Sequence, residues 1–447
     1  MKAAPILLSV LLVAATAGAG AFVPNANGDH PTVETDDASL QDASIQDASI
    51  QGDAVTAVSD APGQIASEND NATRVLGIPD DEVDSSDVRR EHADIGPAVG
   101  FGANATGVML GTDAMERQLE SIDETDERQR QILAQISEIE QQEITLNGRE
   151  RAAVEAYSAG DIDARELVVR LARVSMEAQL LRERLAMLSE QADETPDFSV
   201  DARANNIDFQ LRTYDGPVRS HAKGILEGEH PSERVFVESG GDAVVLSMIH
   251  DGEYVREAKV PARQDRSTTG SMDLEGAERV TFGSYPDIAA TREGADSIGS
   301  DGIFIVQVPH AGGELTAFVD GGSEQVFIDH QRIPLDNTTG HAPVADVQEG
   351  LNVTVDRSYP GGPVRVTVLD AETDDPVIGA TVTVGDAVRS ETVGTTDVDG
   401  QQWIVSPRDP FLLTVLGEDT TVARLEIQPT ETPHLEEYQL ENETETG

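Results

Sequence analysis

The chain has no cysteine, and aromatic residues make up only 4% of its 447 residues. Without cysteine there is no disulfide framework, no thiolate zinc site and no cysteine nucleophile. Lysine occurs three times, as Lys2, Lys223 and Lys259, so arginine supplies nearly all of the positive charge. The 83 acidic residues outnumber the 31 basic ones and give a formal net charge of −52. Binding to nucleic-acid phosphates requires clustered cations, so we expect no nucleic-acid partner.

The combination of many carboxylates and few lysines resembles the composition of proteins from halophilic archaea. Molar salt screens the repulsion between charges to within about 3 Å, and acidic side chains favour solubility more than lysine does. An ordinary acidic secreted protein is the alternative. Under either interpretation the charge is mainly an adaptation to the solvent and does not indicate a cation-binding function.

The N-terminus has the pattern of an export signal. Lys2 precedes an apolar run over residues 3–23, in which Ala17-Gly18-Ala19 and Ala19-Gly20-Ala21 are candidate cleavage motifs. The pattern predicts a signal peptide over residues 1–21 and a secreted or cell-surface location. An uncleaved anchor is the competing interpretation, because about 19 residues suffice to span a bilayer. We expect membrane contact, if there is any, only through this segment.

Residues 22–112 show no sustained hydrophobic period and contain a short pentad repeat over residues 38–51. Asp, Ala, Ser and Asn dominate, which is typical of an acidic disordered spacer. Five sequons make the chain a candidate glycoprotein. The candidate N-glycosylation sites are Asn71, Asn104, Asn337, Asn352 and Asn442.

Residues 113–195 have a helical period. We expect a first helix from Asp113, an interruption at Asn147-Gly148 and a long final helix. That helix carries a heptad seam formed by Leu167, Leu171, Val174, Ala178, Leu181, Leu185 and Leu188. Such a seam requires a partner helix, which predicts an antiparallel helical hairpin or coiled coil. Two alternatives stay open: hairpins of two copies self-associate into a four-helix bundle, or one hairpin packs on the next domain of its own chain.

Three stretches of this part of the chain, 147–174, 213–219 and 234–238, resemble exported haloarchaeal proteins of unknown function. The resemblance spans roughly residues 113–340. It implies a lineage and an extracytoplasmic location, and it carries no activity with it.

Residues 203–345 alternate between short strands and helices. We expect a strand at 208–212, a helix at 217–226 and strands at 234–238, 243–249, 254–260, 303–308, 315–319 and 325–328. Gly240-Gly241-Asp242 and Asp251-Gly252 are hairpin turn signals. The pattern predicts a mixed, mostly antiparallel α+β domain. A strand followed by a glycine-rich turn and a helix is missing, which argues against a nucleotide fold.

Residues 350–428 show short alternating strands typical of a β-sandwich, and an acidic tail follows over residues 429–447. The pattern of residues 364–384, with Asp370-Ala371 and Gly379-Ala380 between alternating strands, resembles carboxypeptidase regulatory-like domains. That resemblance implies a transthyretin-like or immunoglobulin-like sandwich that serves as a spacer or binding module without catalysis. The fold class expected for the whole chain is therefore α+β multidomain.

Catalytic and cofactor motifs are missing from the sequence. No two of the nine histidines have the spacing of a His-Glu-x-x-His site, and no Gly-x-Ser-x-Gly elbow occurs. We predict no catalytic residues and no cofactor. Asp397 and Asp399 resemble half of a calcium loop; we interpret them as a turn, with weak cation binding as the alternative.

Two functions follow from these patterns. The first is a non-catalytic cell-envelope scaffold that binds protein partners or self-associates through the helical hairpin. The second is a hydrolase, or an enzyme-associated regulatory protein, with its site in residues 205–340.

Overall fold

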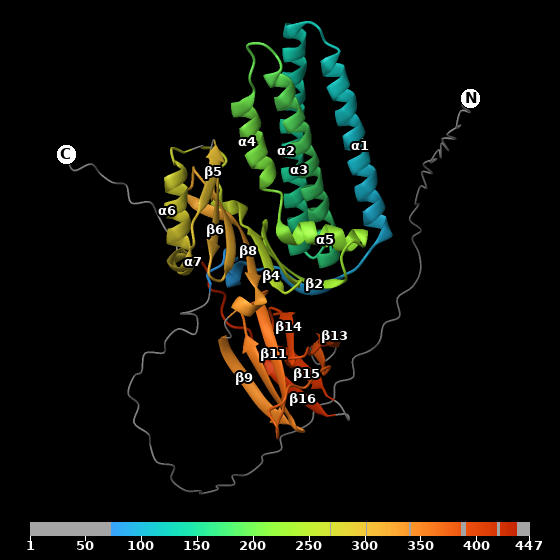
Figure 1. Ribbon diagram of the computed structural model, residues 1–447, viewed down its shortest axis with the longest axis vertical. Helices are drawn as coiled ribbons and strands as arrows, with labels where there is room; N and C mark the ends of the chain where they lie inside the picture. Colours follow the sequence, from blue (N-terminus) through green and yellow to red (C-terminus); the bar gives the residue numbers. More distant parts are fainter. Residues whose placement is uncertain are drawn as a thin grey trace, which may run out of the picture. The chain divides into compact units, whose positions relative to one another are not determined.

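The computed structural model describes residues 73–268, 270–300, 302–338, 341–385, 390–417 and 421–435. The predicted signal peptide, the first part of the predicted spacer, Asn71 and Asn442 lie outside these ranges. Figure 1 shows long helices, a large sheet and a strand-rich C-terminal part. The chain is therefore an α+β multidomain protein, as the sequence predicts. None of the helices within the described ranges has the length and apolarity needed to cross a bilayer.

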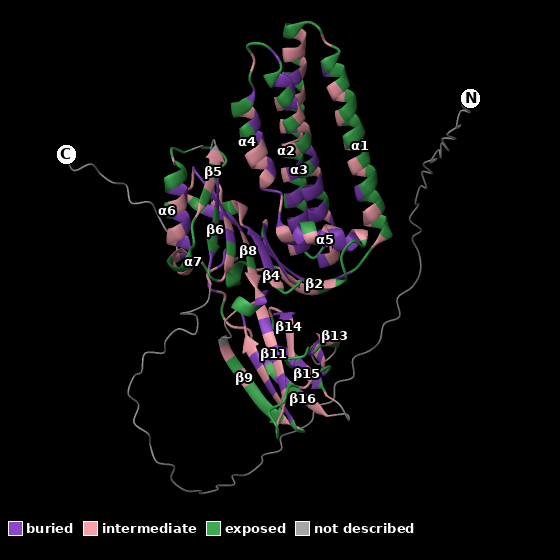
Figure 2. Cartoon of the chain, in the orientation of Figure 1, coloured by how far each residue is buried: buried purple, intermediate pink, exposed green. Residues whose placement is uncertain are grey.

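Five helices form the helical part. They are α1 (Ile95–Glu120), α2 (Thr125–Ser158), α3 (Ala164–Asp193), α4 (Asp201–Arg212) and α5 (Pro217–Glu227). The helix α3 starts where the Asp163 carboxylate accepts a hydrogen bond from the backbone N of Glu166, at 2.9 Å. All seven residues of the predicted seam are buried on it. Figure 2 shows buried residues along α3 between its neighbours.

The seam is covered by helices of the same chain. Its C-terminal two thirds share a core with Ile132, Ile136 and Ile139 of α2 and with Ile207 and Leu211 of α4. Its first residues, Leu167 and Leu171, pack with α5 and the large sheet. Any self-association must therefore use another surface of these helices.

The prediction of a disordered spacer over residues 22–112 is wrong for its end. This end forms β1 (Ser85–Glu91) and most of α1. Glycine-rich sequence has weak helix propensity, but Phe101 of α1 is fully buried against Val169, Ala172 and Met176 of α3. Tertiary packing of this kind stabilises helices that propensity alone does not.

Three other local predictions are wrong. The helix expected to run on from Asp113 is divided, because α1 ends at Glu120 and α2 begins at Thr125. The helix α2 runs through Asn147-Gly148 without a break. A mid-helix glycine costs about 1 kcal/mol relative to alanine, which the burial of Leu146 and Val154 on either side outweighs. Residues 208–212 are the end of α4 and not a strand, because Ile207 and Leu211 are spaced to bury one face of a helix.

The middle of the chain forms one antiparallel sheet of eight strands, in the order β1-β2-β3-β4-β8-β7-β6-β5. Its strands after β1 are β2 (Glu233–Gly240), β3 (Ala243–His250), β4 (Glu253–Lys259), β5 (Asp296–Ser300), β6 (Ile303–His310), β7 (Gly313–Asp320) and β8 (Gln325–Pro334). Apart from 208–212, the strands expected in this region and the helix at 217–226 are confirmed.

The sheet is covered on both faces. On one face, α2, α3 and α5 share a core with β2, β3 and β4, and Phe209 of α4 packs beside β6–β8. On the other face lie α6 (Leu274–Ser284) and α7 (Pro286–Thr291), together with Leu76, Ile78 and Val405. Side chains alternate between these faces along each strand. A charged side chain on either covered face therefore needs a partner within the protein.

The C-terminal part consists of two four-stranded antiparallel sheets, β14-β11-β10-β9 and β13-β12-β15-β16. The strands are β9 (His341–Gln348), β10 (Leu351–Arg357), β11 (Pro363–Asp370), β12 (Thr381–Gly385), β13 (Ser390–Thr395), β14 (Gln401–Val405), β15 (Phe411–Leu416) and β16 (Val422–Ile427). Alternating residues of both sheets, such as Val353, Val366 and Leu413, form one shared core. Two sheets packed over a common core are a sandwich.

Candidate functional site

Three polar side chains meet at one end of the large sheet: His221 in α5, Glu233 at the start of β2 and His250 at the end of β3. Val235 pairs with Met248, so the antiparallel register places Glu233 opposite His250 two residues further on. The helix α5 buries Val218, Ala222 and Ile225 on the same strands. This packing brings His221 over the end of the hairpin.

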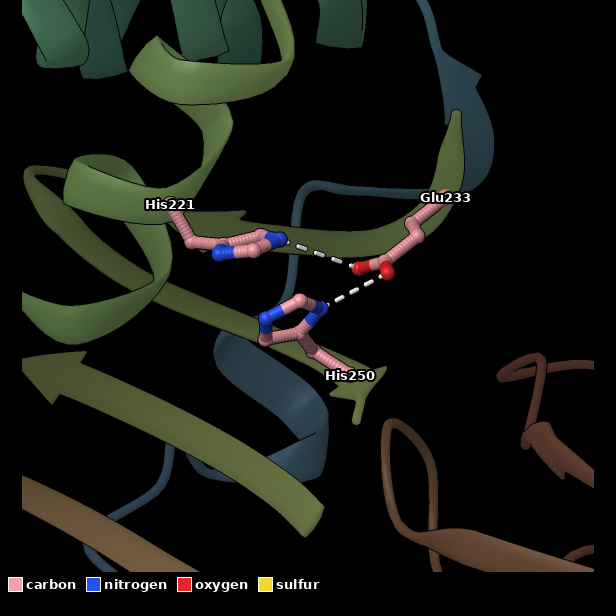
Figure 3. Close-up of side chains that lie close together, drawn as sticks. All are labelled: His221, Glu233 and His250. Atoms are coloured by element: carbon pink, nitrogen blue, oxygen red, sulfur yellow. Dashed lines mark hydrogen bonds and ion pairs between the residues drawn. The ribbon is translucent and has the colours of Figure 1, made fainter. Parts of the chain in front are cut away.

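The donor atoms of these three residues, the His–Glu cluster, lie within 4.8 Å of one another. His250 Nδ1 is 2.7 Å from Glu233 Oε1, and His221 Nε2 is 3.2 Å from Glu233 Oε2. The two imidazole rings are 3.5 Å apart between centroids. Figure 3 shows both rings directed at the same carboxylate from two elements. The cluster thus presents two nitrogens and a carboxylate to one point.

One of these pairs is not a hydrogen bond. His221 Nε2 and Glu233 Oε2 are buried, and neither atom has a hydrogen-bond partner among the described residues. Burial by itself raises the pKa of Glu233, but the two histidines beside its carboxylate bring that pKa below its ordinary value. A carboxylate held ionised beside two imidazoles is a donor set suited to a metal cation.

Other polar groups surround the His–Glu cluster. His250 Nε2 lies 3.1 Å from the exposed Asp251 carboxylate, and the His230 ring stacks on His221 at 4.2 Å between centroids. On neighbouring strands, Glu91 pairs with Glu233 and Glu253 pairs with His250. Glu91 is bound by Arg165 at 3.1 Å and Glu253 lies 3.9 Å from Arg332, so Glu233 and Asp251 are the carboxylates in contact with the imidazoles.

A second charged group on the same face is fully paired. Glu150 of α2 binds Arg219 of α5 at 2.7 Å and also binds Lys259 of β4, while Arg219 Nε donates to Glu257 Oε1 of β4 at 2.7 Å. The other oxygen of Glu257 accepts from the backbone N of Val218 at the start of α5, at 3.0 Å. These four side chains, the buried charge network, join two helices to the sheet.

A further set of bonds fixes the segment before β1 on the opposite face. Asp329 of β8 binds Arg256 at 2.9 Å and accepts from the backbone N of Leu76, also at 2.9 Å. The hydroxyl of Tyr285 donates to the same carboxylate at 3.1 Å. Each of these buried groups has a partner, which is the arrangement expected of a structural contact.

A cavity of about 530 Å³ lies between α2, α4 and the loops of the sheet, within the region expected to hold an enzymatic site. Its carboxylates are already engaged. A hydrogen bond from Arg203 lowers the pKa of Glu140, and hydrogen bonds from Ser267 and Thr268 lower the pKa of Asp265 to about 2. General acids and bases work best with a pKa near the operating pH, so these two are poorly placed for that role.

The structure places Asp397 and Asp399 in a turn. The Asp397 Oδ1 accepts from the backbone N of Asp399 at 3.0 Å and of Gln401 at 2.9 Å. Both side chains are exposed, and Gly400 completes the turn at a φ of 72°. The Asp397 carboxylate, which resembled a calcium ligand, thus accepts hydrogen bonds from the backbone of its own turn, as in an Asx turn.

The three described sequons differ in accessibility. Asn337 is exposed and Asn352 is half-buried on β10. Asn104 lies on α1 and donates from Nδ2 to Glu177 Oε1 at 3.1 Å. Because a glycan would be attached at that nitrogen, Asn337 is the best placed of the three in the folded chain.

The His–Glu cluster was not predicted, because its members are 12 and 17 residues apart and come from different elements. One signal was present. Glu233 and His250 lie at equal distances on either side of the Gly241-Asp242 turn, so a hairpin with a tight turn must place them opposite each other. Only the packing of α5 adds His221.

Comparison with known proteins places the chain in families of unknown function. Residues 1–231 match a domain of unknown function, DUF7096. The chain belongs to the DUF7096 family. Residues 235–339 match a family of unknown function, DUF7094, and residues 342–424 match an archaeal fibronectin-III type-like domain. No curated protein and no solved structure matches the chain.

The family boundaries meet at the His–Glu cluster. His221 lies in the DUF7096 match, His250 lies in the DUF7094 match, and Glu233 lies between the two. The cluster therefore contains one histidine from each of the two matched regions. The fibronectin-III type-like match agrees with a C-terminal β module in an archaeal protein of unknown function.

Proposed function

We propose that this DUF7096 chain is a non-catalytic, extracytoplasmic scaffold of the cell envelope of a halophilic archaeon. The buried charge network is the observation that supports the proposal most directly. Its four charged side chains pair with one another across α2, α5 and β4. Glu150 and Lys259 also line a pocket of about 170 Å³, but their charges are paired with each other there. We infer that these buried, mutually paired charges hold the two helices and the strand in one arrangement.

The junction with the C-terminal sheets supports the same proposal. Tyr254 and Ser247 both donate to the carbonyl of Gly361, at 2.9 and 2.6 Å, and Arg408 binds Glu238 at 2.8 Å. We propose that the C-terminal module, which resembles carboxypeptidase regulatory-like sandwiches, is a spacer or binding module held on this platform. The acidic composition and the predicted signal peptide are the grounds for the location.

The helix α1 offers the surface for protein contact. Residues 95–112 carry no charge in a chain of net charge −52, and Ile95, Val99, Met109 and Leu110 on this helix are exposed. Exposed apolar groups that gather on one element are a usual mark of protein interaction. We propose that α1, and not the covered seam of α3, mediates self-association or partner binding.

The test of the scaffold uses a photoreactive amino acid at Val99 in intact cells, with light scattering of the purified chain in molar salt. We expect a discrete crosslinked product, either a dimer of the chain or an adduct with another extracytoplasmic protein. The double variant Met109→Glu/Leu110→Glu should abolish it, whereas Asp113→Asn on the same helix should not. An intact Met1 on a cytoplasmic chain would contradict export, and crosslinking unchanged by the double variant would contradict the α1 surface.

The enzymatic alternative makes a different prediction. A hydrolase acting from the cavity beside α2 and α4 would lose product formation when Glu143, which accepts a hydrogen bond from Tyr214 at 2.6 Å, is changed to Gln. We expect the purified chain to show no hydrolysis that depends on Glu143. Turnover of a peptide, ester or glycoside substrate that disappears in Glu143→Gln would replace the scaffold proposal.

A further inference from the structure

We propose that the His–Glu cluster is a zinc site, in which His221 Nε2, His250 Nδ1 and the Glu233 carboxylate bind one Zn²⁺ ion. This inference does not depend on the scaffold function, because a metal can hold together an enzyme as well as a scaffold. It rests on three observations: the spacing of the donor atoms, the unpaired atoms between them and the groups that surround them.

The spacing fits a tetrahedral ion. Zinc binds His nitrogen and carboxylate oxygen at about 2.0–2.2 Å, which separates two ligand atoms by about 3.3 Å. His221 Nε2 and Glu233 Oε2 are 3.2 Å apart, and His250 Nδ1 and Glu233 Oε1 are 2.7 Å apart. Small side-chain rotations suffice to open the second distance. Calcium and magnesium prefer all-oxygen sites, so two imidazoles favour a transition metal.

The unpaired atoms point to a missing partner. His221 Nε2 and Glu233 Oε2 are buried, face each other and lack hydrogen bonds within the described part of the chain. Leaving a buried polar atom unsatisfied costs about 1–3 kcal/mol. A cation between these two atoms would satisfy both at once. Figure 3 shows the ring and the carboxylate oriented toward this common point.

The surrounding groups match those of metal-bound histidines. A ligating imidazole usually donates its second N–H to a carboxylate, which fixes its tautomer. His250 Nε2 has such a partner in Asp251, at 3.1 Å, so Nδ1, which faces Glu233, is the nitrogen left to bind the ion. On the flanking strands, Glu91 and Glu253 are paired with Arg165 and Arg332, so the negative charge that favours a cation comes from Glu233 and Asp251.

His230 is positioned to supply the fourth ligand. Its ring stacks on His221, with 14° between the two planes, and lies directly over Gly224 of α5. A Cβ at position 224 would be 2.2 Å from His230 Cδ2, so only glycine leaves room for this ring. The donor atoms within 4.8 Å of one another are those of His221, Glu233 and His250, so the exposed His230 side chain must turn from its stacked position to become a fourth ligand. Four protein ligands make a structural centre.

The test uses the full chain, freed of metal by a chelator and kept in molar salt, with Zn²⁺ and Co²⁺ as probes. Titration calorimetry and elemental analysis should give one Zn²⁺ per chain. We expect His221→Ala, His250→Ala and Glu233→Gln each to weaken binding by at least about tenfold, since even the outer partners of metal ligands are worth about 10–100-fold. The matched control is His310→Gln, on β6 of the same sheet, which four strands separate from β2.

Spectroscopy separates loss of a ligand from loss of the fold. Co²⁺ in the wild-type chain should give the intense visible bands of a tetrahedral site, which His230→Ala should weaken while one ion stays bound. Unchanged bands in His230→Ala would reject the fourth ligand and leave the three-residue site standing. Absence of stoichiometric Zn²⁺ binding by the wild-type chain, or equal affinity in a folded His221→Ala/His250→Ala variant, would overturn the zinc site itself.

Discussion

Two groups of charged residues lie on the same face of the same sheet and differ in how they are satisfied. The buried charge network pairs two acids with two bases, and its carboxylates also accept backbone or side-chain hydrogen bonds. The His–Glu cluster has one good hydrogen bond, and its other two donor atoms face each other without one. The first group is satisfied by its own members, whereas the second keeps two donor atoms that the proposed Zn²⁺ ion would bind.

The largest effect should come from removing one member of the complete group. Glu150→Ala leaves Arg219 and Lys259 buried without their shared acid, which for a buried ion pair costs about 3–5 kcal/mol. Denaturant unfolding at fixed molar salt measures the loss of free energy of unfolding. Glu155→Ala on the same helix removes only an exposed pair with Arg151 and should change stability by less than about 0.5 kcal/mol. Equal losses of stability in the two variants would show that the buried charge network stabilises the chain no more than an exposed ion pair does.

The next effect belongs to the incomplete group. If Zn²⁺ fills the His–Glu cluster, a zinc concentration 100 times the dissociation constant should raise the free energy of unfolding by about 2.7 kcal/mol. Thermal unfolding with zinc and with a chelator measures this difference. The His310→Gln chain should show the same gain and the His221→Ala/His250→Ala chain none, while a gain in both would mean that zinc binds elsewhere.

A pair of glycine variants tests the close packing around the charge network. A Cβ at Gly216 would lie 2.0 Å from Glu257 Oε2, so Gly216→Ala should displace that carboxylate and cost about 1–3 kcal/mol. Gly148→Ala on α2 meets nothing within 4 Å and should stabilise the chain by about 0.5–1 kcal/mol through helix propensity. Opposite signs in chemical denaturation are the expected result, and a harmless Gly216→Ala would show that Glu257 is free to move.

The smallest effect concerns acid stability. Hydrogen bonds from Ser267 and Thr268 lower the pKa of Asp265 from 3.8 to about 2. A lowered pKa means that the unfolded chain takes up the proton first, so the stability contributed by Asp265 is complete above pH 3.8 and is lost as the pH falls through about 2. The melting temperature of Asp265→Asn should therefore fall less between pH 4 and pH 2 than that of the wild type. The same fall in melting temperature between pH 4 and pH 2 in both chains would contradict the lowered pKa of Asp265.

The strongly periodic parts of the fold could be predicted from the sequence. The seam of α3 repeats every three or four residues over three heptads, and Gly-rich turns separate the short apolar strands of the large sheet. The helix α1 could not be recognised, because its uncharged, glycine-rich residues show no polar face and its formation depends on Phe101 packing against α3. Gly148 was misleading since packing on both sides overrides one unfavourable residue.

The candidate site was harder to predict than the fold, for a physical reason. Ligand sets that lie on one helix have a fixed spacing, as in His-Glu-x-x-His. Here Glu233 and His250 are brought together by strand register and His221 by the docking of α5, so no fixed spacing relates the three. The symmetric placement of Glu233 and His250 about their turn is the part that sequence reasoning could have reached.

The burial of Lys259 has a practical consequence for labelling the protein. The chain has three lysines; Lys259 is enclosed by Glu150 and the ring of Tyr214, Lys223 is paired with Glu227 at 2.6 Å, and Lys2 would leave with a cleaved signal. Reagents that attack amines should therefore find Lys223 as their main side-chain target on a chain from which the signal has been cleaved. Carbodiimide coupling to the abundant carboxylates will report on its neighbours far better than amine chemistry.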